Sequence, residues 1–505
     1  MSAGRPLILR GGRLLDAVGH GAPHRDLLIL DGRIEAVGEP GLGAPDDAEE
    51  RRADGFLLMP GFVNAHTHGH GSFGKGRGDL WSLELLLNAG PWISGGRNDE
   101  DRYLATLLNA AEMIRRGATA VYDLTWEQPR PTIEGMHAVA RAYETAGMRA
   151  LIAPMMADLS FYQVVPGLRD ALPESLRKET DKLALDPFRG AIDACRAVLR
   201  DWPFDAGGLR FGIAPTIPMH CTEEFLTACR ELAGEFACPV HTHMAESKLQ
   251  ALVGRERFGR SLTAHFDELG LLSERFTAAH GVWLDGDDLK RMADCGASVA
   301  HNPGSNLRLG SGIALVREML DAGVNVGIGT DGSNSSDNQN MFEATRLAAY
   351  VSRVAGHDVE RWVSSAEAFG MATVGGARAI GMENLIGRIE PGYAADIVFL
   401  DLSDLAYVPL NDPINQVVYV DDGGSVHTVM IGGRFVYENR RFTTFDEAGL
   451  RRGVENALDR LNRVTAERRD LVLALEPLVA KHCLCFSSRP HHVHRHVEPE
   501  PRETS

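Results

Sequence analysis

The fold is set around residues 59–68, which read Met59-Pro60-Gly61-Phe62-Val63-Asn64-Ala65-His66-Thr67-His68. The apolar part of this stretch is typical of a buried strand, and two histidines follow it directly. Side chains two positions apart in a strand point to the same side, so His66 and His68 can bind one cation. The stretch therefore predicts a strand whose carboxyl end carries part of a metal site.

The chain between residues 57 and 329 has the rhythm of a parallel α/β sheet. Short apolar runs alternate with longer amphipathic patterns, as expected when each strand is followed by a helix. The expected strands are residues 57–63, 118–122, 150–154, 209–213, 239–243, 276–280, 298–301 and 324–329, and the clearest helices are residues 99–116, 132–147 and 223–236. A count of about eight strands favours a closed (β/α)8 TIM-like barrel over an open doubly wound sheet.

Both ends of the chain differ from this middle part, because they contain short strands without long helices between them. In residues 7–38, Asp31-Gly32 separates two apolar runs and favours a hairpin. Similar runs return in residues 395–401 and 426–436. The sequence therefore divides into two β-rich ends, residues 1–58 and 396–445, which are expected to pair in space, a middle part of residues 59–395, and a C-terminal helix with a polar tail in residues 446–505.

The composition is that of a globular protein. Of 505 residues, 44% are hydrophobic and 24% are charged, and the net charge of −17 disfavours nucleic acid as a partner. The apolar runs all fall well short of the roughly 20 residues that span a bilayer, and the N-terminus does not resemble a signal peptide. Seven cysteines, an odd number spread thinly, do not make a disulfide framework. We expect a cytoplasmic protein with no membrane partner.

Further strand ends carry polar side chains. His243 and Glu246 follow one predicted strand, His280 ends another, and Asp331 follows a third. A single histidine at a strand end is more often a hydrogen-bonded structural residue, and an aspartate before glycine is often only part of a turn. Recurrence at four strand ends favours a metal site, because the carboxyl ends of barrel strands meet at one face.

These motifs together resemble the amidohydrolase superfamily. The resemblance rests on residues 60–68, 243–246, 279–281, 301–306, 329–332 and 386–396, and it extends over nearly the whole chain. The most similar branch contains cytosine and guanine deaminases, S-adenosylhomocysteine deaminases and triazine hydrolases. The resemblance implies a metal-dependent (β/α)8 barrel, here residues 59–395, with a composite β-sandwich built from both chain ends, residues 1–58 and 396–445.

The resemblance also implies roles for the strand-end residues. The metal ligands would be His66, His68, His243 and Asp331, and the catalytic residues would be Asp331 with Glu246 and His280. Two-metal relatives bridge their ions with a carboxylated lysine, and no lysine of this chain ends an apolar strand of that kind. We therefore expect one Zn²⁺ per subunit, with Fe²⁺ as an alternative.

The expected reaction is the hydrolytic deamination of an aminated nitrogen heterocycle of purine, pyrimidine, pterin or triazine type. A divalent cation with an open position lowers the pKa of bound water toward about 7, which provides the nucleophile. Asp331 would take the water proton, Glu246 would protonate the ring nitrogen, and His280 would orient the nucleophile. The alternative reactions are hydrolysis of another C–N bond, in an amide or amidine, or of a C–Cl bond.

A different class of function is a catalytically inactive barrel that binds a partner. The chain keeps every metal and catalytic candidate, which argues against this hypothesis. The expected partners are a small heterocyclic substrate and a second copy of the chain, as a homodimer or another homo-oligomer.

The glycine-rich loop of residues 69–79 contains incomplete matches to two phosphate-binding motifs. Gly76 stands where a P-loop requires Ser or Thr, so nucleotide binding is disfavoured. The favoured prediction is a flexible flap in which Lys75, Arg77 or Trp81 touches the substrate, and the alternative is a solvated loop without contact. His70 is not expected to be a ligand.

The remaining substrate-binding candidates, besides Trp81, are His301, Asn302 and Asn306, for which helix and turn capping is an equal alternative. His220 is a weaker candidate. The His/Cys-rich tail, residues 482–485 and 491–496, is expected to be a surface or intersubunit arm in preference to a metal site.

Overall fold

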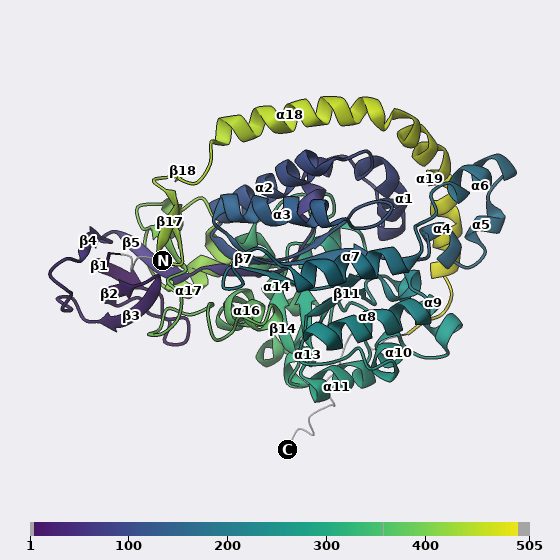
Figure 1. Cartoon of the computed structure of the whole chain (residues 1–505). Coiled ribbons are helices and arrows are strands. Elements are labelled where there is room, and N and C mark those ends of the chain that lie inside the picture. Colours follow the sequence, from purple (N-terminus) through teal and green to yellow (C-terminus); the bar gives the residue numbers. More distant parts are fainter. Residues whose placement is uncertain (1–4, 357, 493–505) are drawn as a thin grey trace, which may run out of the picture.

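The computed structural model describes residues 5–356 and 358–492. In these residues the strands form one nine-stranded sheet and two smaller parallel sheets, of five and four strands. Figure 1 shows the nine-stranded sheet at one end of the molecule and the parallel strands, surrounded by helices, in the middle. None of the described helices is long and apolar enough to cross a membrane.

The nine-stranded sheet joins the two ends of the chain, as the sequence predicts. Its strands are β1 (Leu7–Leu14), β2 (His24–Leu30), β3 (Arg33–Gly38), β4 (Glu49–Arg52), β5 (Phe56–Pro60), β15 (Ile397–Asp401), β16 (Val426–Ile431), β17 (Arg434–Glu438) and β18 (Arg441–Phe442). The order is β18-β17-β16-β15-β5-β1-β2-β3, with β4 paired to β1. The contact between the two ends is the antiparallel pair of β5 and β15, in which Met59 lies opposite Val398.

The parallel strands follow one another in chain order. They are β6 (Phe62–Thr67), β7 (Ala118–Thr125), β8 (Arg149–Met156), β9 (Leu209–Phe211), β10 (Ala214–Pro215), β11 (Val240–Met244), β12 (Phe276–His280), β13 (Ser298–His301) and β14 (Asn325–Ile328). A parallel bridge between Ile213 and Val240 connects the two parallel sheets on one side. Past the end of β14, the backbone N–H of Asp331 donates to the carbonyl of His66, 2.9 Å away.

The prediction of a single strand over residues 57–63 is wrong. The chain divides it at Gly61 into β5, in the nine-stranded sheet, and β6, in a parallel sheet. A Cβ at Gly61 would collide with the side chain of Thr119, so only glycine allows this close passage. The break places His66 and His68 at the end of β6.

Helices cover the parallel strands. They include α2 (Asp99–Arg115), α3 (Ile133–Ala146), α7 (Phe188–Arg200), α8 (Glu223–Phe236), α9 (Lys248–Phe258), α10 (Leu262–Glu268), α11 (Gly286–Cys295), α12 (Pro303–Arg308), α13 (Val316–Asp321), α14 (Met341–Val354), α15 (Ser365–Gly370) and α16 (Gly376–Ala379). The predicted helices begin where capping residues stand: Asn98 forms a capping box with Asp101, and the Thr132 and Thr222 hydroxyls accept from N3 backbone N–H groups.

The C-terminal segment forms two helices, α18 (Glu447–Val464) and α19 (Ala466–Ser487). Figure 1 shows α18 passing over α2 and α19 descending beside the short helices α4 (Phe161–Val164), α5 (Leu168–Ala171) and α6 (Glu174–Asp181). The polar tail expected from Cys483 begins later, because α19 continues to Ser487 with Cys483 and Phe486 buried. The His-rich tail beyond residue 492 lies outside the described residues.

An ion pair fastens the nine-stranded sheet to the parallel strands. Arg149, at the start of β8, donates from Nε and Nη2 to the two carboxylate oxygens of Asp396, at 2.8 and 3.2 Å. Asp396 also accepts from the backbone N–H of Gly432 at 2.7 Å and is 3% exposed. One carboxylate therefore joins β8 to both β15 and the turn after β16.

We predict that Asp396→Ala lowers the apparent free energy of unfolding by about 3 kcal/mol or more, because it leaves the largely buried Arg149 guanidinium without its partner. Denaturant titration followed by circular dichroism measures this loss. Glu179→Ala, which removes an exposed ion pair with Lys182, is the control and should leave the midpoint unchanged. Equal midpoints for the two variants would contradict the prediction.

Candidate metal and substrate site

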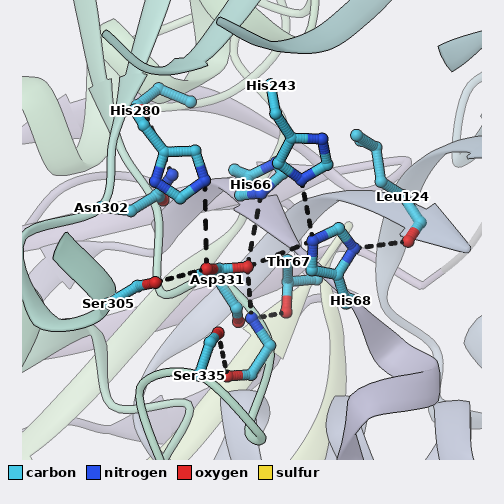
Figure 2. Close-up of polar contacts among 12 residues, drawn as sticks. His66, Thr67, His68, Leu124, His243, His280, Asn302, Ser305, Asp331 and Ser335 are labelled. Carbon is cyan, nitrogen blue, oxygen red and sulfur yellow. Dashed lines mark hydrogen bonds and ion pairs between the residues drawn. The ribbon is translucent and has the colours of Figure 1, made fainter. Parts of the chain in front are cut away.

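Histidine and aspartate side chains from separate strand ends converge on one point. Figure 2 shows His66 and His68 from β6, His243 from β11 and His280 from β12 around Asp331, which follows β14. Asp331 Oδ1 lies 3.5 Å from His66 Nε2 and 3.2 Å from His68 Nε2. All the predicted metal-ligand and catalytic residues, including Glu246, lie in this cluster.

Backbone carbonyls fix the orientation of two of the imidazoles. His68 Nδ1 donates to the carbonyl of Leu124 at 2.7 Å, and His243 Nδ1 donates to the carbonyl of Thr216 at 2.6 Å. A carbonyl only accepts, so the proton of each neutral ring sits on Nδ1 and the Nε2 lone pair faces the cluster. The two Nε2 atoms are 3.1 Å apart, an arrangement that a shared cation stabilises.

The protonation states of the cluster also suit a cation. Burial lowers the pKa of His66 to about 3 and that of His243 well below its usual value, so both rings are neutral at pH 7. Burial raises the pKa of Asp331, but the adjacent His66 and His68 rings outweigh this effect and hold the pKa well below the usual value. Burial lowers the pKa of His68, but the adjacent Asp331 outweighs this effect and raises the pKa above its usual value. Asp331 is therefore a carboxylate beside two neutral imidazoles, those of His66 and His243.

Neighbouring donors hold the Asp331 carboxylate in place. Ser305 Oγ donates to Oδ2 at 2.6 Å, and the Gly332 backbone N–H donates to Oδ1 at 2.7 Å. Asp331 has a φ of +58° and His280 a φ of +71°, both in the left-handed region. This conformation costs a non-glycine residue about 1–2 kcal/mol, and it turns both side chains back over the strand ends.

Glu246 and His280 lie beside the proposed ligands. His280 Nε2 is 3.7 Å from Glu246 Oε2 and 4.0 Å from Asp331 Oδ2. Burial, together with the charges of Asp331 and Glu84, raises the pKa of Glu246 well above its usual value. Its Oε2 has no hydrogen-bond partner among the described residues. Burial therefore favours the protonated form of the Glu246 carboxyl group, next to the cluster.

The predicted substrate-binding residues occupy several places. Asn306 Oδ1 accepts from His280 Nδ1 at 2.9 Å and so orients that ring. His301 and Asn302 are buried beneath the cluster, and Asn302 donates to the carbonyl of Ala300. Trp81 packs edge-on against Trp92, with ring centroids 6.5 Å apart, and lies outside the cavity lining.

The expectation of a flexible flap is wrong for residues 69–74. These form a 3-10 helix, η1 (Gly69–Gly74), in which every residue is buried. Lys75 pairs with Glu112, and Arg77 Nη2 donates to Asn462 Oδ1 of α18 at 2.9 Å. The segment is packed because η1 lies against α2 and both cations have partners away from the site.

A cavity of about 180 Å³ opens from the cluster. Its polar end includes His68, His243, Glu246 and Asp331, and His70 and His220 also reach it. Much of the remaining wall is apolar and comes from α1 (Leu83–Ile93) and from residues 155–185. Sequence reasoning missed this wall. The signal was in α1, whose leucines lie on all of its faces, as in a helix buried on several sides.

The apolar wall is tied to the C-terminal helix. Tyr162, which lines the cavity, donates its hydroxyl to Asn88 Oδ1 at 3.0 Å, and Asn88 Nδ2 donates to the carbonyl of Val472 in α19 at 3.3 Å. Asn88 is 1% exposed and lies beside an apolar cluster shared by α1 and α19. This polar link holds α1 between the cavity and α19.

Comparison with known proteins identifies similar sequences. The chain matches the Amidohydrolase family over residues 57–436. It is 33% identical to a 5-methylthioadenosine/S-adenosylhomocysteine deaminase of Syntrophomonas wolfei over 83% of this chain and 90% of that protein. It is also 33% identical to a 5'-deoxyadenosine deaminase of Methanopyrus kandleri over 81% of this chain and 87% of that protein.

Solved structures are similar as well. An adenosine deaminase from Xanthomonas campestris with bound zinc superposes with a TM-score of 0.79 at 27% identity, over 90% of this chain and 98% of that chain. An atrazine chlorohydrolase from Arthrobacter aurescens complexed with zinc gives a TM-score of 0.78 at 25% identity, over 90% of this chain and all of that chain.

We predict that Asn88 and Tyr162 are energetically coupled. Asn88→Leu should lower the free energy of unfolding by at least about 0.5 kcal/mol more in the native chain than in a Tyr162→Phe background. The reason is that the substitution leaves the buried tyrosine hydroxyl without its hydrogen-bond partner only in the native chain. Unfolding free energies of the four chains in the cycle measure the difference. Strictly additive costs would show that the link contributes nothing.

Proposed function

Because the chain belongs to the amidohydrolase family, we propose that it removes an amino group from an aminated nitrogen heterocycle by hydrolysis and releases ammonia. It is a hydrolase that acts on C–N bonds. The observation that carries the proposal is the buried Glu246 carboxyl, 3.7 Å from His280 and with its pKa raised by burial, beside a cluster of imidazoles and one carboxylate. This arrangement offers a proton donor for the ring next to a cation site.

We assign His66, His68, His243 and Asp331 as the ligands of one divalent cation. Neutral nitrogen donors with one carboxylate suit Zn²⁺, and Fe²⁺ is the alternative. When bound, such a cation lowers the pKa of water and so supplies a nucleophile at neutral pH. The unpartnered, buried Nε2 of His66 supports the assignment, because a buried polar atom normally has a partner.

The chain's own residues handle the protons. The Asp331 carboxylate accepts a proton from the attacking water, and Glu246 donates its proton to the ring nitrogen beside the carbon under attack. His280 has Nδ1 bonded to Asn306, so its Nε2 lone pair accepts a hydrogen bond from that water and orients it. The proton held by Asp331 then passes to the departing amino group, which leaves as ammonia, and the remaining hydroxyl proton passes to the Glu246 carboxylate as the carbonyl forms.

A second candidate reaction is hydrolysis of another C–N bond or of a C–Cl bond. The similarity to an atrazine chlorohydrolase favours the latter. Glu246 favours deamination, because protonation of the ring nitrogen assists attack on the carbon that bears the amino group. A binding protein without activity is disfavoured, since the metal and catalytic candidates converge with their protonation states matched.

We also propose the finer architecture. Strands β6 to β14, with β9 and β10 counted as one interrupted strand because both pair with β8, form a closed (β/α)8 barrel in residues 59–395, supported by the bridge at Ile213 and the hydrogen bond from Asp331 to His66. The nine-stranded sheet folds over as a β-sandwich of residues 1–58 and 396–445, supported by a buried apolar cluster shared by its strands from both chain ends. Residues 446–505 form the C-terminal helices and tail.

Trp81, His301 and Asn302 are proposed to support the substrate site from behind its walls, and Asn306 to position His280. A cytoplasmic location is supported by free cysteines throughout the described residues. Assembly as a homodimer is supported by the stacked Tyr350–Tyr419 pair and by the exposed Val354 and Val420, which lie one helical turn after Tyr350 and directly after Tyr419 in the chain.

The ligand assignment predicts metal content. The native chain, loaded with zinc and dialysed, should retain about one ion, and His68→Ala should lose most of it because it removes one of four ligands. His70→Ala, two positions further along, is the matched control and should retain the ion. Mass-spectrometric metal analysis of the folded variants measures both. Equal retention by the two variants would refute the assignment.

The role of Glu246 predicts the activity of its amide variant. Glu246→Gln should lower ammonia release at least about 100-fold, since it removes the ring-protonating acid, and should keep its zinc. The assay uses zinc-loaded protein with aminopyrimidines, aminopurines, pterins, adenosine derivatives and aminotriazines. Glu235→Gln, an exposed glutamate paired with Arg196, is the control and should be fully active. An undiminished rate of ammonia release by Glu246→Gln would contradict the proposed function. The same holds if the native enzyme releases no ammonia from any of the compounds.

A further inference from the structure

The cavity has an apolar arm that the proposed chemistry does not use. Leu83, Leu86 and Leu87 of α1 line this arm together with Leu159, Phe161 and Leu183. The reacting ring belongs at the other end, beside Glu246 and Asp331. The arm therefore faces whatever the substrate carries beyond that ring.

The arm provides no positive charge. The cavity lining contains no lysine or arginine among the described residues, and its ionisable side chains are four histidines, Tyr162, Glu246 and Asp331. His220 Nδ1 lies 3.2 Å from the carbonyl of Leu159, and burial lowers the pKa of this ring to about 4, so it is not cationic at pH 7. A carboxylate or phosphate placed in the arm would lack a counter-charge.

A cation next to this wall, Arg97, is already engaged. Arg97 Nη1 donates to the carbonyl of His70 at 2.6 Å, and Nη2 donates to the carbonyl of Ile93 at 2.9 Å. Its guanidinium also lies over the ring of Phe73, 5.1 Å from the centroid. Turning Arg97 toward a ligand would break contacts that hold η1 against α1.

The wall on the α1 side is a fixed surface. The helix is packed between the cavity and α19, and the Tyr162–Asn88–Val472 link crosses it. Placing a charged group against this wall would bury it against aliphatic side chains, which costs several kcal/mol when no partner is present.

We propose that this arm selects substrates whose substituent beyond the reacting ring is uncharged and apolar. The substrate class is an aminated heterocycle with an alkyl, alkylthio or aryl substituent and without phosphate, carboxylate or ammonium groups near α1. This inference rests on the proposed function for the orientation of the ring. It adds a selection between substrates by the charge of that substituent, which the catalytic residues do not provide.

Two matched pairs of compounds test the inference. 5′-Methylthioadenosine and S-adenosylhomocysteine share the aminopurine, ribose and thioether and differ in the charged amino acid. The second pair is an aminotriazine bearing a butylamino or a carboxypropylamino group. Calorimetry with zinc-loaded Glu246→Gln measures binding without turnover, and ammonia release by the native enzyme measures kcat/KM. We expect the apolar member of at least one pair to be favoured at least about 100-fold in both measurements.

Placing a cation in the arm should change this preference. Leu87→Arg should improve binding of the carboxylate-bearing compound. It should therefore reduce the preference for the apolar over the charged member of the pair, as the ratio of their affinities, at least about 10-fold. Leu484→Arg adds the same charge at an exposed position of α19, 74% exposed, and should leave the ratio unchanged.

The outcomes separate this inference from the proposed function. Equal binding of charged and apolar members, or binding of no compound from either pair, would overturn the inference. Selective binding of the apolar member without ammonia release from any compound would leave the inference standing and contradict the proposed deamination. Ammonia release at equal rates from both members would support deamination and overturn the selection.

Discussion

The site depends on two imidazole nitrogens that are held face to face by the backbone. Nε2 of His68 and Nε2 of His243 lie 3.1 Å apart, because each ring donates its Nδ1 proton to a main-chain carbonyl. Those carbonyls belong to Leu124, on β7, and to Thr216, just after β10. The register of neighbouring parallel strands thus fixes the tautomers, and the lone pairs are directed by the fold itself.

The two acidic groups of the site, Asp331 and Glu246, are both buried, but their surroundings shift their pKa values in opposite directions. Asp331 lies next to the His66 and His68 rings and accepts hydrogen bonds from Ser305 and Gly332, and its pKa is held well below the usual value. Glu246 has no hydrogen-bond donor at Oε2 among the described residues, and burial together with two nearby acidic groups raises its pKa well above the usual value. Two carboxyl groups in one buried site can therefore serve as proton acceptor and proton donor at the same pH.

Much of the site could be predicted from sequence because its residues directly follow apolar strands. His66, His243 and His280 are read from a local pattern, and the parallel topology brings such positions to one face. The division of residues 57–63 at Gly61 could not be predicted this way, since it depends on Thr119 of a distant strand. The packing of η1 and the apolar wall of α1 depend likewise on α2 and α19, which local patterns do not reveal.

The central claim is that the fold brings three imidazole nitrogens and one carboxylate oxygen to a single cation. X-ray absorption at the zinc edge of the zinc-loaded full chain, with an anomalous-scattering map of its crystals, tests this claim most directly. We predict one zinc bound by His66, His68, His243 and Asp331, with nitrogen and oxygen ligands at about 2.0–2.2 Å. Zinc held by sulfur at about 2.3 Å, as in a site on the Cys-containing C-terminal segment, or no zinc at this cluster, would contradict the account.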